Sequence, residues 1–101
     1  MPEVEICGSK KAMPTVHLLI NGKVQGVFYR ASAKEVADEL QLTGWVKNTS
    51  NGDVEAMVTG SNEQLQQFIA WCKKGPARAV VNEVQVTFKA EEQFDVFKIA
   101  R

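Results

Sequence analysis

The chain has 101 residues, of which 45% are hydrophobic and 24% charged, and its twelve basic and twelve acidic side chains give a formal net charge of zero. This length fits one domain, and the balanced charge argues against a protein that binds nucleic acid mainly through phosphate contacts. No apolar run reaches the roughly 18 residues of a membrane helix, and the first residues lack the apolar core of a signal peptide. We therefore expect a cytoplasmic monomer without membrane or nucleic-acid partners.

The first part of the chain passes from an extended pattern to a helical one. Residues 1–14 mix charge, glycine and proline without periodicity and are interpreted as a flexible tail, so that the domain covers residues 15–101. Alternating apolar residues over 16–20 predict a strand. Helical spacing then predicts a helix over 28–40, whose apolar stripe consists of Ala33, Val36, Ala37 and Leu40.

The centre of the chain carries a hairpin signal and a capped helix. Strands predicted over 43–49 and 53–59 are separated by Ser50-Asn51-Gly52, and Asn-Gly pairs favour the positive φ angles of tight hairpin turns. A second helix begins after Gly60, where Ser61 and Gln64 have the spacing of a capping box. Its apolar stripe consists of Leu65, Phe68, Ile69 and Cys72, so Cys72 is interpreted as a packing residue rather than a nucleophile.

Two further extended segments, over 84–88 and 97–99, complete the pattern βαββαβ with a short last strand. This order predicts an α+β fold of the ferredoxin-like, or split βαβ, type: an antiparallel sheet with two helices on one face. The sheet face beneath the helices is expected to carry Val16, Leu18, Ile20, Val84 and Val86, or the set one residue out of phase.

The turn between the first strand and the first helix has the features of an anion site. Gly22 and Gly26 lie in it, and Arg30 comes as the helix begins. Backbone N–H groups and the helix dipole favour an anion at such a position, and a guanidinium can bind two of its oxygens. The spacing matches neither a Walker A loop nor GxGxxG. An ordinary turn with a surface arginine is the alternative.

Asn48 is the candidate partner for this turn, because the ferredoxin-like topology brings the end of the second strand beside the loop after the first. The carbonyl oxygen of an asparagine can accept a hydrogen bond from a water and direct that water at phosphorus. The alternative is an asparagine that serves only the hairpin. The histidine and the cysteines indicate no further catalytic or metal site: His17 falls within a strand, and no Cys or His cluster indicates a metal.

Two segments resemble the signatures of the acylphosphatase family. They are Gly22-x-Val24-Gln25-Gly26-Val27-x-Tyr29-Arg30 and Gly44-Trp45-Val46-Lys47-Asn48-x-x-x-Gly52-x-Val54-Glu55, and the resemblance extends over residues 14–101. It implies a hydrolase that cleaves acyl phosphates to a carboxylate and inorganic phosphate without metal or cofactor. It also implies that Arg30 binds the phosphoryl group and that Asn48 holds the attacking water. The phosphate-binding loop would supply backbone N–H groups from Gln25, Gly26, Val27, Phe28, Tyr29 and Arg30.

The sequence departs from many members of that family at two positions: Ala33 replaces a threonine, and Tyr29 replaces a phenylalanine. The first change could loosen support for the helix start. The expected chemistry needs neither residue, because a carboxylate leaving group, with a pKa of about 4 for its conjugate acid, departs without a general acid. With no plausible nucleophile near the turn, we expect direct attack by water. The alternative is a ferredoxin-like module that binds RNA or a ligand without catalysis.

Overall fold

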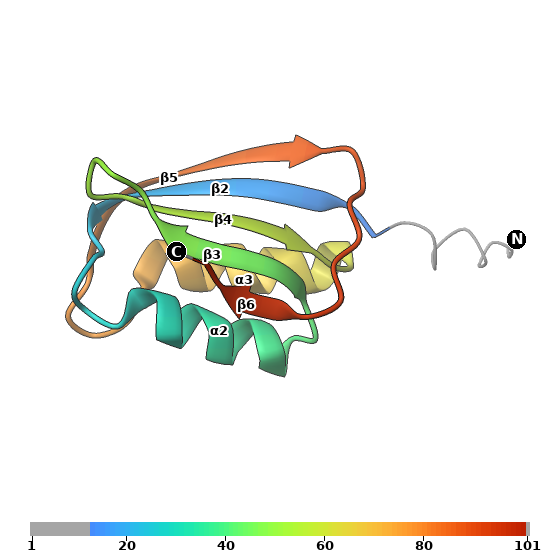
Figure 1. Ribbon diagram of the computed structural model, residues 1–101, viewed down its shortest axis with the longest axis horizontal. Helices are drawn as coiled ribbons and strands as arrows, with labels where there is room; N and C mark the ends of the chain where they lie inside the picture. The colour runs from blue at the N-terminus through green and yellow to red at the C-terminus, as the bar shows by residue number, and fades with distance from the viewer. Residues whose placement is uncertain (1–12, 101) are drawn as a thin grey trace, which may run out of the picture.

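The computed structural model describes residues 13–100, so residues 1–12, most of the predicted tail, lie outside the described part of the chain. Two helices and five strands follow one another in the predicted order (Figure 1). Their bounds are β2 (Thr15–Lys23), α2 (Tyr29–Glu39), β3 (Thr43–Asn48), β4 (Val54–Thr59), α3 (Asn62–Lys74), β5 (Val80–Lys89) and β6 (Phe97–Ile99).

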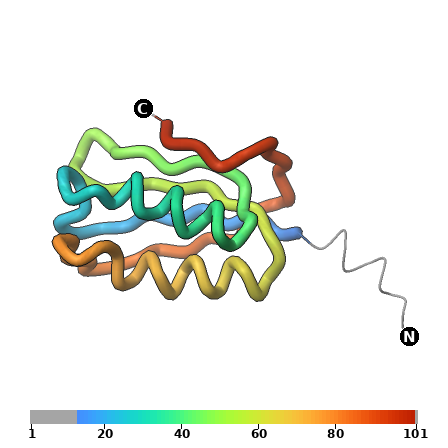
Figure 2. The backbone as a smooth tube through the Cα atoms, turned by 90° about the horizontal axis from the view of Figure 1, so that it is seen from below, coloured from blue at the N-terminus to red at the C-terminus, as the bar shows by residue number. Residues whose placement is uncertain are grey.

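The strands form one sheet in the order β5-β2-β4-β3-β6, and both helices cover the same face of it (Figure 2). The first four strands of this order, β5, β2, β4 and β3, pair antiparallel with one another. The ferredoxin-like α+β fold is therefore confirmed. The sheet is nevertheless mixed, because β6 pairs parallel with β3. After β5 the chain crosses the end of the sheet and reverses once, so β6 runs in the direction of β3.

The core lies between the sheet and the helices, and it confirms only part of the expected sheet face. Val16, Leu18 and Ile20 on the central strand β2 are completely buried. On β5, Val84 packs partly against the core, whereas Val86 and Phe88 are 36% and 56% exposed. Val86 lies on the expected face, as the partner of Leu18, but it is exposed and does not pack into the core. Alternation identifies the inward-facing residues of a strand, but β5 is an edge strand and the helices leave its far end uncovered.

Both helices bury the stripes that their spacing predicts. In α2, Ala33 and Ala37 are buried, and Val36 and Leu40 pack on the core. In α3 the capping box is present: the Ser61 hydroxyl accepts from Gln64 N, and the Gln64 side chain accepts from Ser61 N. All four predicted stripe residues of α3 are buried.

Cys72 is a packing residue, as predicted: 1% of it is exposed, and burial raises the pKa of its thiol to about 12. Its backbone oxygen accepts a hydrogen bond of 2.7 Å from the Tyr29 hydroxyl. The residue four positions on is Pro76, which has no N–H to donate to that oxygen. Tyr29 therefore joins the start of α2 to the end of α3 and satisfies a carbonyl that the helix cannot.

Candidate active site

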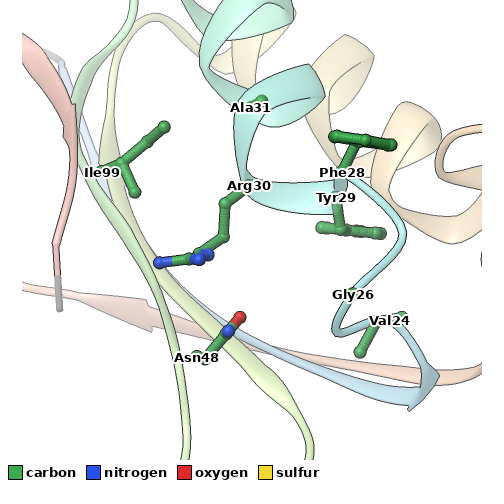
Figure 3. A pocket seen from close by; sticks show the side chains of 8 residues that line it. All are labelled: Val24, Gly26, Phe28, Tyr29, Arg30, Ala31, Asn48 and Ile99. Atoms are coloured by element: carbon green, nitrogen blue, oxygen red, sulfur yellow. The ribbon is translucent and has the colours of Figure 1, made fainter.

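An open pocket of about 270 Å³ lies where the β2–α2 turn, the end of β3 and the end of β6 meet. Arg30 and Asn48 both face it, from α2 and β3 respectively (Figure 3). The two residues assigned to chemistry are thus brought together from distant parts of the chain. The lining residues are Val24, Gly26, Phe28, Tyr29, Arg30, Ala31, Asn48 and Ile99.

The turn that forms one wall is shorter than predicted, because β2 continues through Lys23. Two residues of the turn have a positive φ: Gly26 at 75° and Phe28, the N-cap of α2, at 64°. For a phenylalanine this left-handed conformation is unusual, and its side chain is 76% exposed at the pocket. Left-handed residues next to right-handed ones direct successive N–H groups to one side, which makes an anion-binding concavity.

Among the described residues, no backbone or side-chain acceptor takes a hydrogen bond from the amides of residues 25–28. Those of Tyr29 and Arg30 belong to the first turn of α2, which has no intrahelical acceptors. First-turn amides carry the positive end of the helix dipole. Free donors of this kind suit an anion.

Arg30 supplies the only charged side chain among the residues that line the pocket. It is half-buried, and its Nη1 donates a long hydrogen bond of 3.4 Å to the backbone oxygen of Ala100, just after β6. Figure 3 shows the guanidinium reaching across the pocket from α2 toward the strand that carries Asn48. The pocket therefore has a positive electrostatic character without a lining carboxylate to offset it.

Asn48 is the last residue of β3, and its amide group extends into the pocket near the guanidinium (Figure 3). Its Oδ1 is buried and has no hydrogen-bond partner within the described residues. An unsatisfied buried acceptor costs roughly 1–3 kcal/mol. An acceptor left unsatisfied at a pocket is available to a donor that binds there, such as a water molecule.

The predicted loop residues do not all line the pocket. Gly26, Phe28, Tyr29 and Arg30 line the pocket, whereas Val27 is buried in the core. Gln25 does not line the pocket, and its side chain reaches the β3–β4 turn instead. Ile99 was not foreseen as a lining residue, because only the parallel pairing of β6 with β3 brings it there.

No three His, Cys, Asp or Glu side chains between residues 13 and 100 lie close enough together to hold a metal ion. Neither helix in this part of the chain is long and apolar enough to cross a membrane.

The chain is similar to known proteins in both sequence and fold. The family model Acylphosphatase matches residues 16–99. An acylphosphatase from Marinobacter nauticus is 49% identical over 83 residues, which cover 81% of this chain and 90% of the relative. The solved structure of an acylphosphatase from Coxiella burnetii has a TM-score of 0.87 and 39% identity, covering 91% of this chain and 97% of its own. That of an acylphosphatase from Bacillus subtilis has a TM-score of 0.86 and 33% identity, covering 88% and 100%.

Proposed function

This chain belongs to the acylphosphatase family and hydrolyses acyl phosphates, and we propose that Arg30 and Asn48 perform the reaction from the two sides of one pocket. The observation that carries this assignment is the buried, unpartnered Oδ1 of Asn48 in the same pocket as the guanidinium. A binding module without catalysis is not favoured, because the family match covers nearly the whole described domain.

The phosphoryl group is bound by the turn and by Arg30. The free amides at the start of α2 and the guanidinium offer donors to the phosphoryl oxygens, on which negative charge is spread in the transition state. Because these donors are held by the fold before substrate arrives, they need little rearrangement during the reaction. No metal or cofactor takes part in this scheme.

Water attacks phosphorus directly. Asn48 Oδ1 accepts a hydrogen bond from the water and aligns it opposite the leaving carboxylate. The P–O bond to the acyl group breaks as the new P–O bond forms, and the water's proton passes to solvent. The carboxylate leaves without protonation, so no general acid is required. Among the lining residues the only nucleophilic side chain is Tyr29, whose hydroxyl is buried against Cys72.

Hydrolysis of benzoyl phosphate in ¹⁸O-labelled water, with a metal chelator present, tests this scheme. We expect steady release of benzoate, with the label in inorganic phosphate. Label in the benzoate would show attack at carbon and refute the role of Asn48. Mass spectrometry of the quenched enzyme should show no phosphorylated residue, and a trapped phosphoenzyme would replace direct attack by a two-step mechanism.

The enzyme is proposed to act in the cytoplasm as a monomer, with no nucleic-acid partner and with residues 15–101 as the catalytic domain. The pocket is built from one chain, and the family match begins at residue 16. Light scattering should give a mass near 11.2 kDa. A chain that begins at Met13 should keep the activity, and loss of activity would show that the first residues belong to the catalytic unit.

A further inference from the structure

Gln25 connects the two halves of the site. It belongs to the turn between β2 and α2, yet its side chain points to the β3–β4 turn. Its Nε2 donates to two backbone oxygens there, that of Thr49 at 2.9 Å and that of Asp53 at 2.7 Å. Thr49 directly follows Asn48, so one side-chain amide joins the anion-binding turn to the residue beside the water-binding asparagine.

The β3–β4 turn is closed by hydrogen bonds of its own. Thr49 N donates to Asp53 O at 2.8 Å, and Asp53 N donates to the Thr49 hydroxyl at 3.0 Å. These bonds act within the turn. On the side of β2, the turn is held by the pairing of Ile20 with Val54 and by Asn21, and Gln25 is what joins it to the phosphate-binding turn. The Gln25 amide can donate both of its protons to the β3–β4 turn, because a primary amide has two donors and both backbone oxygens lie within hydrogen-bond distance.

We propose that Gln25 is a positioning residue for hydrolysis, which sets the distance between the bound phosphoryl group and the water held by Asn48. This inference rests on the proposed function. A displacement of about 1 Å between reacting atoms can lower a rate by roughly 100-fold. The phosphate-binding donors themselves are backbone groups and Arg30, so they survive a change of the Gln25 side chain. Loss of the side chain should therefore lower kcat and leave phosphate binding nearly intact.

Asn21 provides a matched control. Its Nδ2 donates to Asp53 Oδ1 at 3.0 Å, so it also ties β2 to the β3–β4 turn. It reaches a side-chain atom of Asp53 rather than the backbone, and it lies outside both the pocket and the anion-binding turn. A residue that merely stabilises the hairpin and a residue that positions Asn48 can thus be compared on the same turn.

The experiment measures kcat for benzoyl phosphate and the inhibition constant of inorganic phosphate in the wild type, Gln25→Ala and Asn21→Ala. We expect Gln25→Ala to lower kcat at least tenfold with less than a threefold change in the inhibition constant. Asn21→Ala should keep kcat within twofold, even if its melting temperature falls as far as that of Gln25→Ala. Equal losses of kcat in the two variants, or an unchanged kcat in Gln25→Ala, would overturn the proposal. An inactive wild type would instead refute the proposed function.

Two further measurements separate positioning from general support. If Gln25 acts through Asn48, Gln25→Ala should have no additional effect on kcat when it is made in Asn48→Ala. A full additional loss would contradict the proposal. Gln25→Glu keeps the volume but loses the donors, so its kcat should fall as well. Relative to wild type at the same pH, it should recover as pH falls from 7 to 5 and the carboxyl gains a proton to donate. A pH-independent ratio would also count against it.

Discussion

Replacing Asn48 by alanine should separate activity from stability. The side chain is proposed to hold the attacking water, so its loss should reduce kcat by about 100-fold, or about 2.7 kcal/mol at 1.36 kcal/mol per factor of ten. Binding of inorganic phosphate should change little, since Arg30 and the turn amides remain. Steady-state kinetics with benzoyl phosphate and product inhibition measure both quantities.

The same substitution should not weaken the fold. Oδ1 is buried without a partner, at a cost of roughly 1–3 kcal/mol in the folded protein, and alanine removes that cost. After allowing for the packing lost with the side chain, we expect the unfolding free energy to rise by about 1 kcal/mol. For a domain of this size that raises the melting temperature by about 4–8 °C.

Asn51→Ala is the control for this pair of effects. Asn51 is an exposed amide in the same hairpin but outside the pocket, so its replacement should keep kcat within twofold and lower stability slightly through the turn. The reasoning would be refuted if Asn48→Ala kept a kcat within threefold of wild type. It would fail equally if that variant lost more than 1 kcal/mol of stability, because the buried oxygen would then have an internal role.

Three other results follow from the structure. Arg30→Ala should raise the inhibition constant of inorganic phosphate at least 100-fold, and Arg30→Lys should recover only part of the affinity, because a lysine lacks the two-pronged geometry. Tyr29→Phe should lower the unfolding free energy by about 1–2 kcal/mol in urea denaturation, because Cys72 O loses its donor. Stability should fall from about pH 9 toward pH 12, by up to about 1.4 kcal/mol per pH unit, because the unfolded thiol of Cys72 ionises there while burial keeps the folded pKa near 12.

The sign and the source of the pH effect can be checked together. Burial also raises the pKa of Tyr29, so above pH 10 both groups bind protons more tightly in the folded state than in the unfolded state. The stability that these two groups contribute is therefore fully present below pH 9 and is lost as pH rises. Cys72→Ala should show a shallower decline between pH 9 and 10 than the wild type, and identical slopes would mean that Cys72 is not the group responsible.

Much of this architecture could be predicted because local signals and the global fold agree. The Ser61–Gln64 capping box, the Asn51-Gly52 hairpin and the stripes of both helices depend on short-range spacing, which the sequence displays directly. Arg30 and Asn48 could be paired because the βαββαβ order and the resemblance to a known family placed the end of the second strand near the first turn.

What could not be predicted depends on where an element lies in the sheet. Alternation alone does not indicate that β5 is an edge strand, so the exposure of Val86 was missed. Nothing in a three-residue segment reveals that β6 pairs with β3 and brings Ile99 to the pocket. Phenylalanine is a poor indicator of a left-handed N-cap, so the positive φ of Phe28 was not predicted. The bonds of the Gln25 amide likewise join residues that only the tertiary fold brings together.

The strand β6 also affects how the enzyme becomes active. The residues that line the pocket range along the chain from Val24 to Ile99. The segment leading to β6 is held by two hydrogen bonds: Glu92 N donates to the Thr15 hydroxyl, and Glu92 O accepts from the Thr59 hydroxyl. Contacts between residues this distant in sequence slow the folding of the domain as a whole. The pocket is complete only when Ile99 is in place, so a nascent chain should stay inactive until β6 has left the ribosome.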